Sequence, residues 1–200
     1  MQIELTKNQA LTLATLGAFN SRDKWTPVLT ETLVTIADNK LTAMATDRFA
    51  AVKFTDDVIA DDVEFRLTPN LSKFLKTNLV KAYRDPIWID VADNGAVTIT
   101  LSDRAALTEI PSTGKFPTIN TLFESWQPAT TAMAAAYTIE KLARLEKIKL
   151  DGEFADLWHL ESGANPNGNT NRPGPTLATS AKNDRLVALV QPNLLVKEKN

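Results

Sequence analysis

The sequence predicts an α+β protein made of repeated βαβββ units, with the helices on one face of antiparallel sheets. The main observation is a pattern of one extended lead-in, one helix and three short strands that recurs at 1–55, about 62–110 and about 132–195 of the 200 residues. The strands of each copy are short, and those expected at 2–5 and 28–37 alternate in polarity, as half-buried strands do. Repeats of this length usually bury their apolar faces side by side. The sequence therefore predicts one piece of a larger, repetitive assembly.

The first unit begins with an alternating strand at 2–5 and a helix at 7–20, whose apolar residues include Leu11, Leu13 and Leu16. The stretch 28–37 alternates and is rich in β-branched residues, which is typical of a strand. Asp38 and Asn39 predict a turn. Two further strands are expected at 40–45 and 49–54.

The second unit repeats this order. An extended segment at 63–67 is followed by Thr68, a good N-cap, and Pro69, which suits the first helical position. The helix is expected to reach Arg84, before Pro86. Strands should follow at 87–91, 97–101 and 105–110, with a tight turn at Asp93-Asn94-Gly95.

The third unit follows a non-repeating stretch at 111–131 with one expected helical turn at 118–126. We expect a helix at 137–149 and strands at 154–160, 176–180 and 186–190. Between them, Gly, Asn and Pro at 162–175 predict an irregular, mobile loop. The predicted organisation is a first domain of two units at 1–112, a connector at 113–131 and a shortened second domain at 132–200.

Composition excludes several classes of protein. The chain has no cysteine, one histidine (His159) and seven glycines, so it offers little for a metal cluster, a cofactor or nucleophilic catalysis, and none is expected. No apolar run has the ~20 residues that a membrane helix needs. The N-terminus lacks the layout of a signal peptide, so a cytoplasmic protein without membrane partners is expected.

The formal net charge is −2, so a nucleic-acid-binding surface would require basic residues gathered on one face. The predicted helices do carry them: at 100° per residue, the lysines and Arg84 of the second helix lie opposite its leucines. A solvated helix face is the plain alternative. If the helices share one surface, its cations suit phosphate contacts. The candidate DNA-binding residues are Lys7, Arg22, Lys73, Lys76, Lys81, Arg84, Lys141, Arg144 and Lys147.

Three segments give the chain a resemblance to the bacterial β-type DNA sliding clamps, the processivity factors of replicative polymerases. KLTAMATDRFAAVKF at 40–54 resembles the clamp's strand–turn–strand with its Ala-Thr-Asp turn. TGKFP at 113–117 resembles the Asp-Gly-Glu-Phe-Pro type connector, and RLVALVQPNLL at 185–195 resembles the C-terminal strand and tail. Arg48-Phe49 and Gln191 depart from the family pattern.

The resemblance implies a DNA-clamp fold, no enzymatic activity and two binding surfaces. The helices would line a hole around duplex DNA, and an outer pocket would take short peptides of the DNA polymerase and the clamp loader. For each apolar pocket residue, a place in the core is the alternative. The candidate partner-peptide pocket consists of Thr46, Arg48, Phe49, Pro69, Leu71, Leu189, Val190, Pro192 and Leu194.

The same resemblance implies a head-to-tail homo-oligomer, but the number of subunits stays open. Family rings hold twelve units, which three units per chain would fill with four copies; a trimer, a dimer or a monomer is also open. The short length suggests a phage-encoded version. The alternative function is a clamp-like α+β protein-interaction module that does not encircle DNA.

Overall fold

The computed structural model describes residues 1–79, 86–130, 135–168 and 172–193. The first unit begins with Thr6, which caps its helix: the Gln9 amide donates to Thr6 Oγ1 at 3.2 Å, and the Thr6 amide donates to Gln9 Oε1 at 3.0 Å. Pro27 starts a short 3₁₀ turn, so the strand expected from Val28 begins four residues later. The elements are β1 (Gln2–Leu5), α1 (Lys7–Leu16), η1 (Gly17–Phe19), η2 (Pro27–Thr30), β2 (Thr32–Ala37), β3 (Lys40–Thr46) and β4 (Ala50–Asp57).

The second unit confirms the predicted helix start, because Thr68 Oγ1 accepts the Leu71 amide at 3.2 Å. The expected helix end at Arg84 lies outside the described residues. The elements are β5 (Val63–Leu67), α2 (Pro69–Leu79), β6 (Ile87–Val91), β7 (Val97–Thr100) and β8 (Ala106–Glu109).

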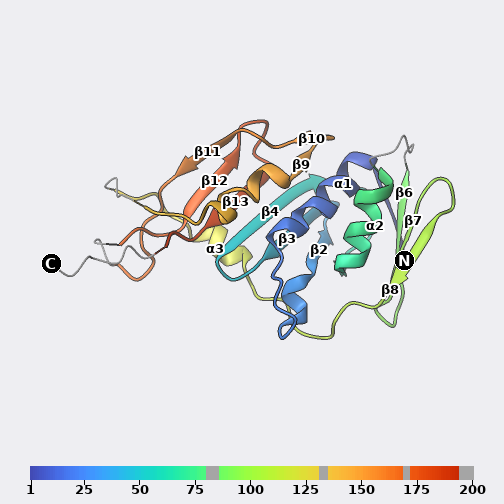
Figure 1. Cartoon of the computed structure of the whole chain (residues 1–200). Coiled ribbons are helices and arrows are strands. Elements are labelled where there is room, and N and C mark those ends of the chain that lie inside the picture. Colours follow the sequence, from blue (N-terminus) through green and yellow to red (C-terminus); the bar gives the residue numbers. More distant parts are fainter. Residues whose placement is uncertain (80–85, 131–134, 169–171, 194–200) are drawn as a thin grey trace.

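The two units exchange their lead-in strands. β1 of the first unit pairs with β6 of the second, and β5 of the second unit pairs with β2 of the first. Helices α1 and α2 lie side by side and cover one side of this pair of sheets (Figure 1). Each unit therefore completes the sheet of the other, an exchange that the repeat in the sequence does not specify.

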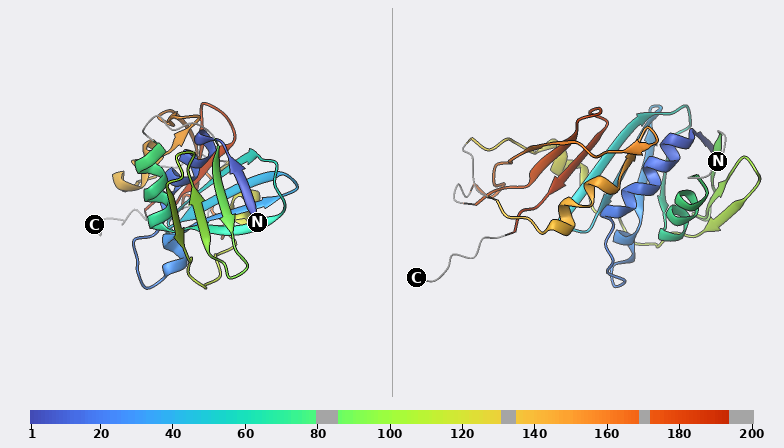
Figure 2. Two further views of the ribbon diagram at one scale, coloured as in Figure 1. Left: turned by 90° about the vertical axis from the view of Figure 1, so that its right-hand side faces the viewer. Right: turned by 45° about the horizontal axis from the view of Figure 1, so that its top comes forward.

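The third unit extends the first unit's sheet. Strand β13 pairs antiparallel with β4, which gives a seven-stranded sheet of order β11-β12-β13-β4-β3-β2-β5 beside the four-stranded sheet β1-β6-β7-β8. Figure 2 shows the four-stranded sheet at one end of the molecule and the third unit at the other. The elements are α3 (Asn120–Glu124), α4 (Ile139–Leu142), η3 (Leu145–Lys147), β9 (Lys149–Leu150), β10 (Glu153–Phe154), β11 (Trp158–Glu161), β12 (Thr176–Ser180) and β13 (Leu186–Val190).

The long helix expected at 137–149 is wrong. Only α4 and η3 are helical there, because residues 149–150 pair with 153–154 as a small hairpin. The Lys149 amide donates to Thr15 Oγ1 of α1 at 3.0 Å, which fixes the end of the helical stretch against the first unit. The strand expected from Phe154 begins at Trp158, whereas the strands at 176–180 and 186–190 are confirmed.

The seven-stranded sheet buries both faces. Its inner face packs Phe54 and Val52 against Phe19 and the leucines of α1 and α2. Its outer face packs Met44 and Ala51 against Phe116 and Ile119 of the connector. Among the described residues, no helix is long and apolar enough to cross a membrane. The division into domains at 112 and 131 stays a prediction.

Candidate functional site: an outer apolar cavity and an inner basic cavity

An open cavity of about 550 Å³ lies on the outer face of the seven-stranded sheet, where β4 and β13 meet. Ala51 and Leu189 are register partners on these strands and form its floor. Apolar side chains provide most of the surface, so the cavity can hold apolar side chains of a ligand. Its lining consists of Thr46, Arg48, Phe49, Ala50, Ala51, Leu122, Ser125, Trp126, Gln127, Ala164, Asn165, Pro166, Pro175, Leu189 and Gln191.

The turn between β3 and β4 forms one wall. Asp47 Oδ1 accepts the amides of Phe49 at 2.9 Å and Ala50 at 2.8 Å, and Thr46 Oγ1 donates to the Ala50 carbonyl at 2.8 Å. Arg48 has a φ of 80°, the left-handed region that an arginine adopts rarely. These bonds hold Phe49 at the cavity edge, where its side chain is 58% exposed.

The segment around α3 and the 162–175 loop form the opposite wall. Trp126 Nε1 donates to the Pro175 carbonyl at 2.8 Å, and the Ala164 amide donates to the Gln127 carbonyl at 2.8 Å. A Cβ at Gly163 would lie 2.2 Å from the Pro175 oxygen, so only glycine fits this close approach. The loop that the sequence predicts to be irregular thus docks on the tryptophan of the connector.

The structure brings together four of the predicted pocket residues: Thr46, Arg48, Phe49 and Leu189. The others are elsewhere. Pro69 lines a different cavity. Leu71 and Val190 are completely buried, and Pro192 is buried but does not line the outer cavity. Leu194 lies outside the described residues. The helix that contributes is α3, through Leu122, and not α2. The signal in the sequence was the spacing of Leu122 and Trp126, two large apolar residues four apart in the expected helical turn at 118–126.

A second cavity, of about 370 Å³, lies on the helix side between η1, α2 and α4. It gathers basic side chains from all three units, as the charge pattern predicts. Its lining includes Arg22, Lys73, Lys76, Arg144 and Lys147, together with the single acid Glu140.

Three of these cations have no anionic partner among the described residues: Lys73, Lys76 and Lys147. Burial of the Lys76 side chain, and secondarily the nearby charge of Lys147, lower the pKa of Lys76 from its ordinary value of 10.5. Arg22 is 85% exposed and pairs only loosely with Glu140, at 3.8 Å. The cavity thus holds positive charge that no acid in the described part of the chain neutralises, which suits an anionic ligand.

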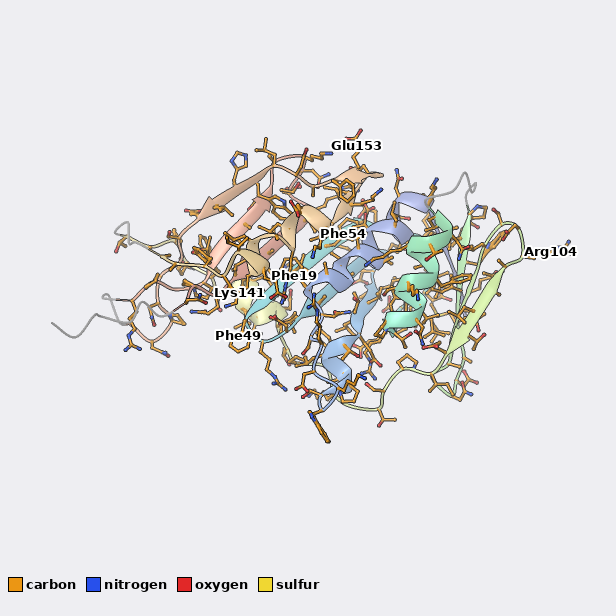
Figure 3. The ribbon with its side chains drawn as sticks, viewed as in Figure 1. Phe19, Phe49, Phe54, Arg104, Lys141 and Glu153 are labelled. Atoms are coloured by element: carbon orange, nitrogen blue, oxygen red, sulfur yellow. The ribbon has the colours of Figure 1, made fainter. Side chains whose placement is uncertain are left out.

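The remaining predicted DNA-binding residues have other positions. Arg144 is used internally, in an ion pair with Asp47 at 2.6 Å. Lys141 lies over the Phe49 ring at 5.1 Å and donates to the Gln191 carbonyl at 3.3 Å, which places it beside the outer cavity (Figure 3). Lys7 begins α1 without lining the basic cavity, and Lys81 and Arg84 lie outside the described residues.

No candidate metal centre is found in the described residues, where no three His, Asp or Glu side chains are grouped to hold an ion. The sequence contains no cysteine ligand. The two cavities are therefore the sites to explain: an apolar one outside the sheet and a basic one on its helix side.

Comparison with known proteins gives these sites a context. No protein-family model matches the sequence, and no curated protein matches it. Solved structures do match: a putative DNA polymerase III β subunit from Eubacterium rectale has a TM-score of 0.69 at 9% identity over 98% of this chain. The β subunit from Thermotoga maritima has a TM-score of 0.68 at 10% identity over 98%.

A sliding clamp from Pseudomonas aeruginosa bound to griselimycin has a TM-score of 0.64 at 12% identity over 98% of this chain. The chain spans 66% of the length of each of these three proteins. At such low identity the likeness concerns the fold. The resemblance inferred from the Ala-Thr-Asp turn, the connector and the C-terminal strand is confirmed at that level: this chain has the fold of the bacterial DNA polymerase III β sliding clamps.

Proposed function

We propose that this protein is a non-enzymatic DNA sliding clamp, several copies of which encircle duplex DNA with the helix side and bind partner peptides in the outer cavity. The observation that carries the proposal is the separation of the two cavities by one sheet. Basic side chains of three units converge on the helix side, and the apolar cavity opens on the outer face. A protein that tethers a partner to DNA needs two separate surfaces, because it must bind the DNA and the partner peptide at the same time.

The basic cavity supports contact with the DNA backbone rather than with bases. Its cations are lysines and arginines on helices, and phosphate contacts of this kind are independent of sequence and weaken with salt. Loose contacts to phosphates would let a ring move along the duplex. Because the protein has a net charge of −2, we expect DNA to bind at this basic face and not over the whole surface.

The outer cavity supports binding of a short peptide. The P. aeruginosa clamp with the same fold is bound to griselimycin, and we extend this kind of ligand to the cavity of the present chain. Its floor and walls offer apolar pockets for side chains, and the Gln191 and Arg48 side chains at the lining can bond a peptide backbone. The polymerase and the clamp loader are the proposed partners.

Anisotropy of a short fluorescent duplex tests the DNA-binding surface. Lys73→Glu with Lys147→Glu reverses two cavity charges. We expect this variant to bind DNA more weakly. The slope of the logarithm of affinity against the logarithm of salt concentration should also fall, by about one for each phosphate that the variant no longer neutralises. The matched control is Lys40→Glu with Lys115→Glu, which makes the same charge change outside the basic cavity. Equal affinity of the two double variants would exclude the helix side as the DNA-binding surface.

The alternative function, a protein-interaction module that does not encircle DNA, predicts a different result. Such a module would bind griselimycin in the outer cavity but would not respond to charge reversal at Lys73 and Lys147. Isothermal titration with griselimycin and duplex DNA on the same preparation separates the two functions.

A further inference from the structure

A buried serine in the wall of the basic cavity has a hydroxyl without a hydrogen-bond partner. Ser72 lines this cavity and is 5% exposed, and its Oγ is the only buried side-chain oxygen or nitrogen without a partner among the described residues. Helical serines often bond back to the preceding turn, but here the Thr68 carbonyl accepts the Ser72 amide, at 3.0 Å, and not the hydroxyl. Since buried polar groups are rarely left unpaired, this hydroxyl indicates a place where a ligand with an acceptor oxygen binds.

A glycine leaves space beside this hydroxyl. Gly17 begins η1 and lines the same cavity. A Cβ on Gly17 would lie 3.8 Å from Ser72 Oγ and 3.4 Å from Asn20 Nδ2, which is ordinary contact. Asn20 Nδ2 itself donates to the Thr30 carbonyl at 2.9 Å, so it is held away from the serine. A small ligand can therefore occupy the position that a side chain at residue 17 would fill.

Three lysines lie around the same space. Lys73 and Lys76 follow Ser72 on α2, and the spacing of four residues places Ser72 and Lys76 on one face of the helix. Lys147 reaches the cavity from η3. Its charge is close enough to Lys76 to add to the effect of burial in lowering the pKa of Lys76. An anion between these ammonium groups would relieve their repulsion.

The one acid among the described lining residues is already paired. Glu140 Oε1 lies 3.7 Å from Arg144 Nη2 and 3.8 Å from Arg22 Nη1. Arg144 is further held by Asp47, at 2.6 Å. The arginines and the acids thus engage one another, and the serine hydroxyl and the three lysines are left for a ligand.

We propose that Ser72, Lys76 and Lys147 form a discrete site for a phosphate group with at least three free oxygens, as in inorganic phosphate or the terminal phosphate of a nucleotide. The serine hydroxyl donates to one oxygen, and the ammonium groups contact the others. A phosphate inside a DNA strand fits less well, because two of its oxygens carry sugars that keep it at the mouth of the cavity. DNA can contact the lysines there, but it does not reach the buried hydroxyl.

The site deepens the proposed function, because a bound phosphate would neutralise charge on the surface that is proposed to contact DNA. Free phosphate would then weaken DNA binding more than chloride does at equal ionic strength. This link to DNA rests on the proposed function, whereas the site itself does not. A protein that binds phosphate but no duplex would retain the site and lose the proposed function.

Thermal unfolding tests whether the site exists. A ligand that binds only the folded state raises the melting temperature, so the wild type should melt a few degrees higher in inorganic phosphate than in chloride of equal ionic strength. Thymidine 5′-monophosphate is the second arm. A larger shift with the nucleotide at equal concentration would identify a nucleotide as the source of the phosphate, and a smaller shift would identify free phosphate. Equal melting temperatures in phosphate, nucleotide and chloride overturn the proposal.

Two variants remove the site without removing a lysine. Ser72→Ala should raise the dissociation constant for phosphate about tenfold in isothermal titration, because it deletes one bond to a charged ligand. Gly17→Ala should weaken binding at least as much by filling the space over the hydroxyl. The Gly17 φ of −56° suits alanine, so the variant should fold. Gly114→Ala is the matched control, since its Cβ would meet Val28 at 3.4 Å, outside the basic cavity.

The same variants distinguish the phosphate site from DNA contacts. Without phosphate, Ser72→Ala should melt no lower than the wild type, because the hydroxyl has no bond to lose. Its affinity for a short duplex, measured by anisotropy, should equal that of the wild type. If Ser72→Ala weakens duplex and phosphate binding equally, the serine belongs to the DNA-binding surface and the proposal is overturned. Unchanged phosphate affinity in both Ser72→Ala and Gly17→Ala also overturns it.

Discussion

Arg144 Nη1 lies 2.6 Å from Asp47 Oδ2, and the two side chains are 14% and 12% exposed. Arg144 also lines the basic cavity, whereas the other oxygen of Asp47 accepts the amides of Phe49 and Ala50 at the edge of the outer cavity. One buried ion pair thus connects the helix side of the molecule to the wall of the outer cavity. Arg144, which the sequence predicts as a DNA contact, also holds this turn in position through Asp47.

Replacing Arg144 by Ala should destabilise the protein by about 3–5 kcal/mol, because it leaves the Asp47 charge buried and unpaired. The free energy of unfolding from urea denaturation measures this cost. Pairing the change with Asp47→Asn in a double-mutant cycle should reveal strong coupling. Additive effects of the two changes would mean that the ion pair does not stabilise the turn.

Lys76→Met should stabilise the protein and weaken DNA binding. Burial lowers the pKa of Lys76, so below pH 10.5 the unfolded chain holds this proton more tightly than the folded chain does. The charged lysine therefore destabilises the folded state at neutral pH, and stability rises as the pH climbs through the lowered pKa toward 10.5. The variant should melt a few degrees higher at pH 7, with a flatter pH profile in this window. A lower melting temperature would show that the lysine charge is not the destabilising group.

Arg185→Ala should loosen the junction between the third unit and the first. The hydrogen bond to Asp151, at 2.6–2.8 Å, is the main cause of the raised pKa of Arg185, and Asp56 Oδ1 accepts a further bond at 2.9 Å. Bonds to charged groups contribute about 1.5–3 kcal/mol when partly buried. We expect a loss of that size in the free energy of unfolding. Arg185→Lys keeps the charge and should recover only part of it, because lysine cannot bridge both acids.

Leu122→Asp should abolish binding of griselimycin, because it places a charge in the apolar wall of the outer cavity. Pro69→Ala is the control, since Pro69 was expected in this pocket but lies in the basic cavity. Isothermal titration should show wild-type affinity for the control. If Pro69→Ala weakens binding and Leu122→Asp does not, the pocket assignment from the sequence is right and the one from the geometry is wrong.

The strands of the repeat could be predicted because their signals are local. Asp38 and Asn39 both have positive φ, 53° and 59°, and turn β2 into β3 as the sequence suggests. The strands at 176–180 and 186–190 begin and end where predicted. Thr68 caps α2 through its own side chain. In each case the residues that decide the structure are neighbours in the sequence.

The parts that could not be predicted depend on distant contacts. The helical stretch of α4 and η3 ends where the Lys149 amide bonds to Thr15, which is 134 residues away in the chain. α3 reaches the outer cavity because Lys53 lies over Phe123 at 5.2 Å and donates to Asn120 at 3.3 Å. The resemblance led to α2 as the pocket helix, but Leu71 is buried completely between the helices and the sheet. No local pattern distinguishes a leucine in the core from one in a pocket.

The central claim, that copies of this protein encircle duplex DNA, is tested most directly by retention on DNA of different topology. The protein is incubated with a nicked circular duplex or with the same DNA cut once, and bound protein is separated by gel filtration at moderate salt. We predict that the protein stays on the circle and dissociates from the linear form, because a ring can leave only over an end. Equal retention on the two forms would contradict encirclement.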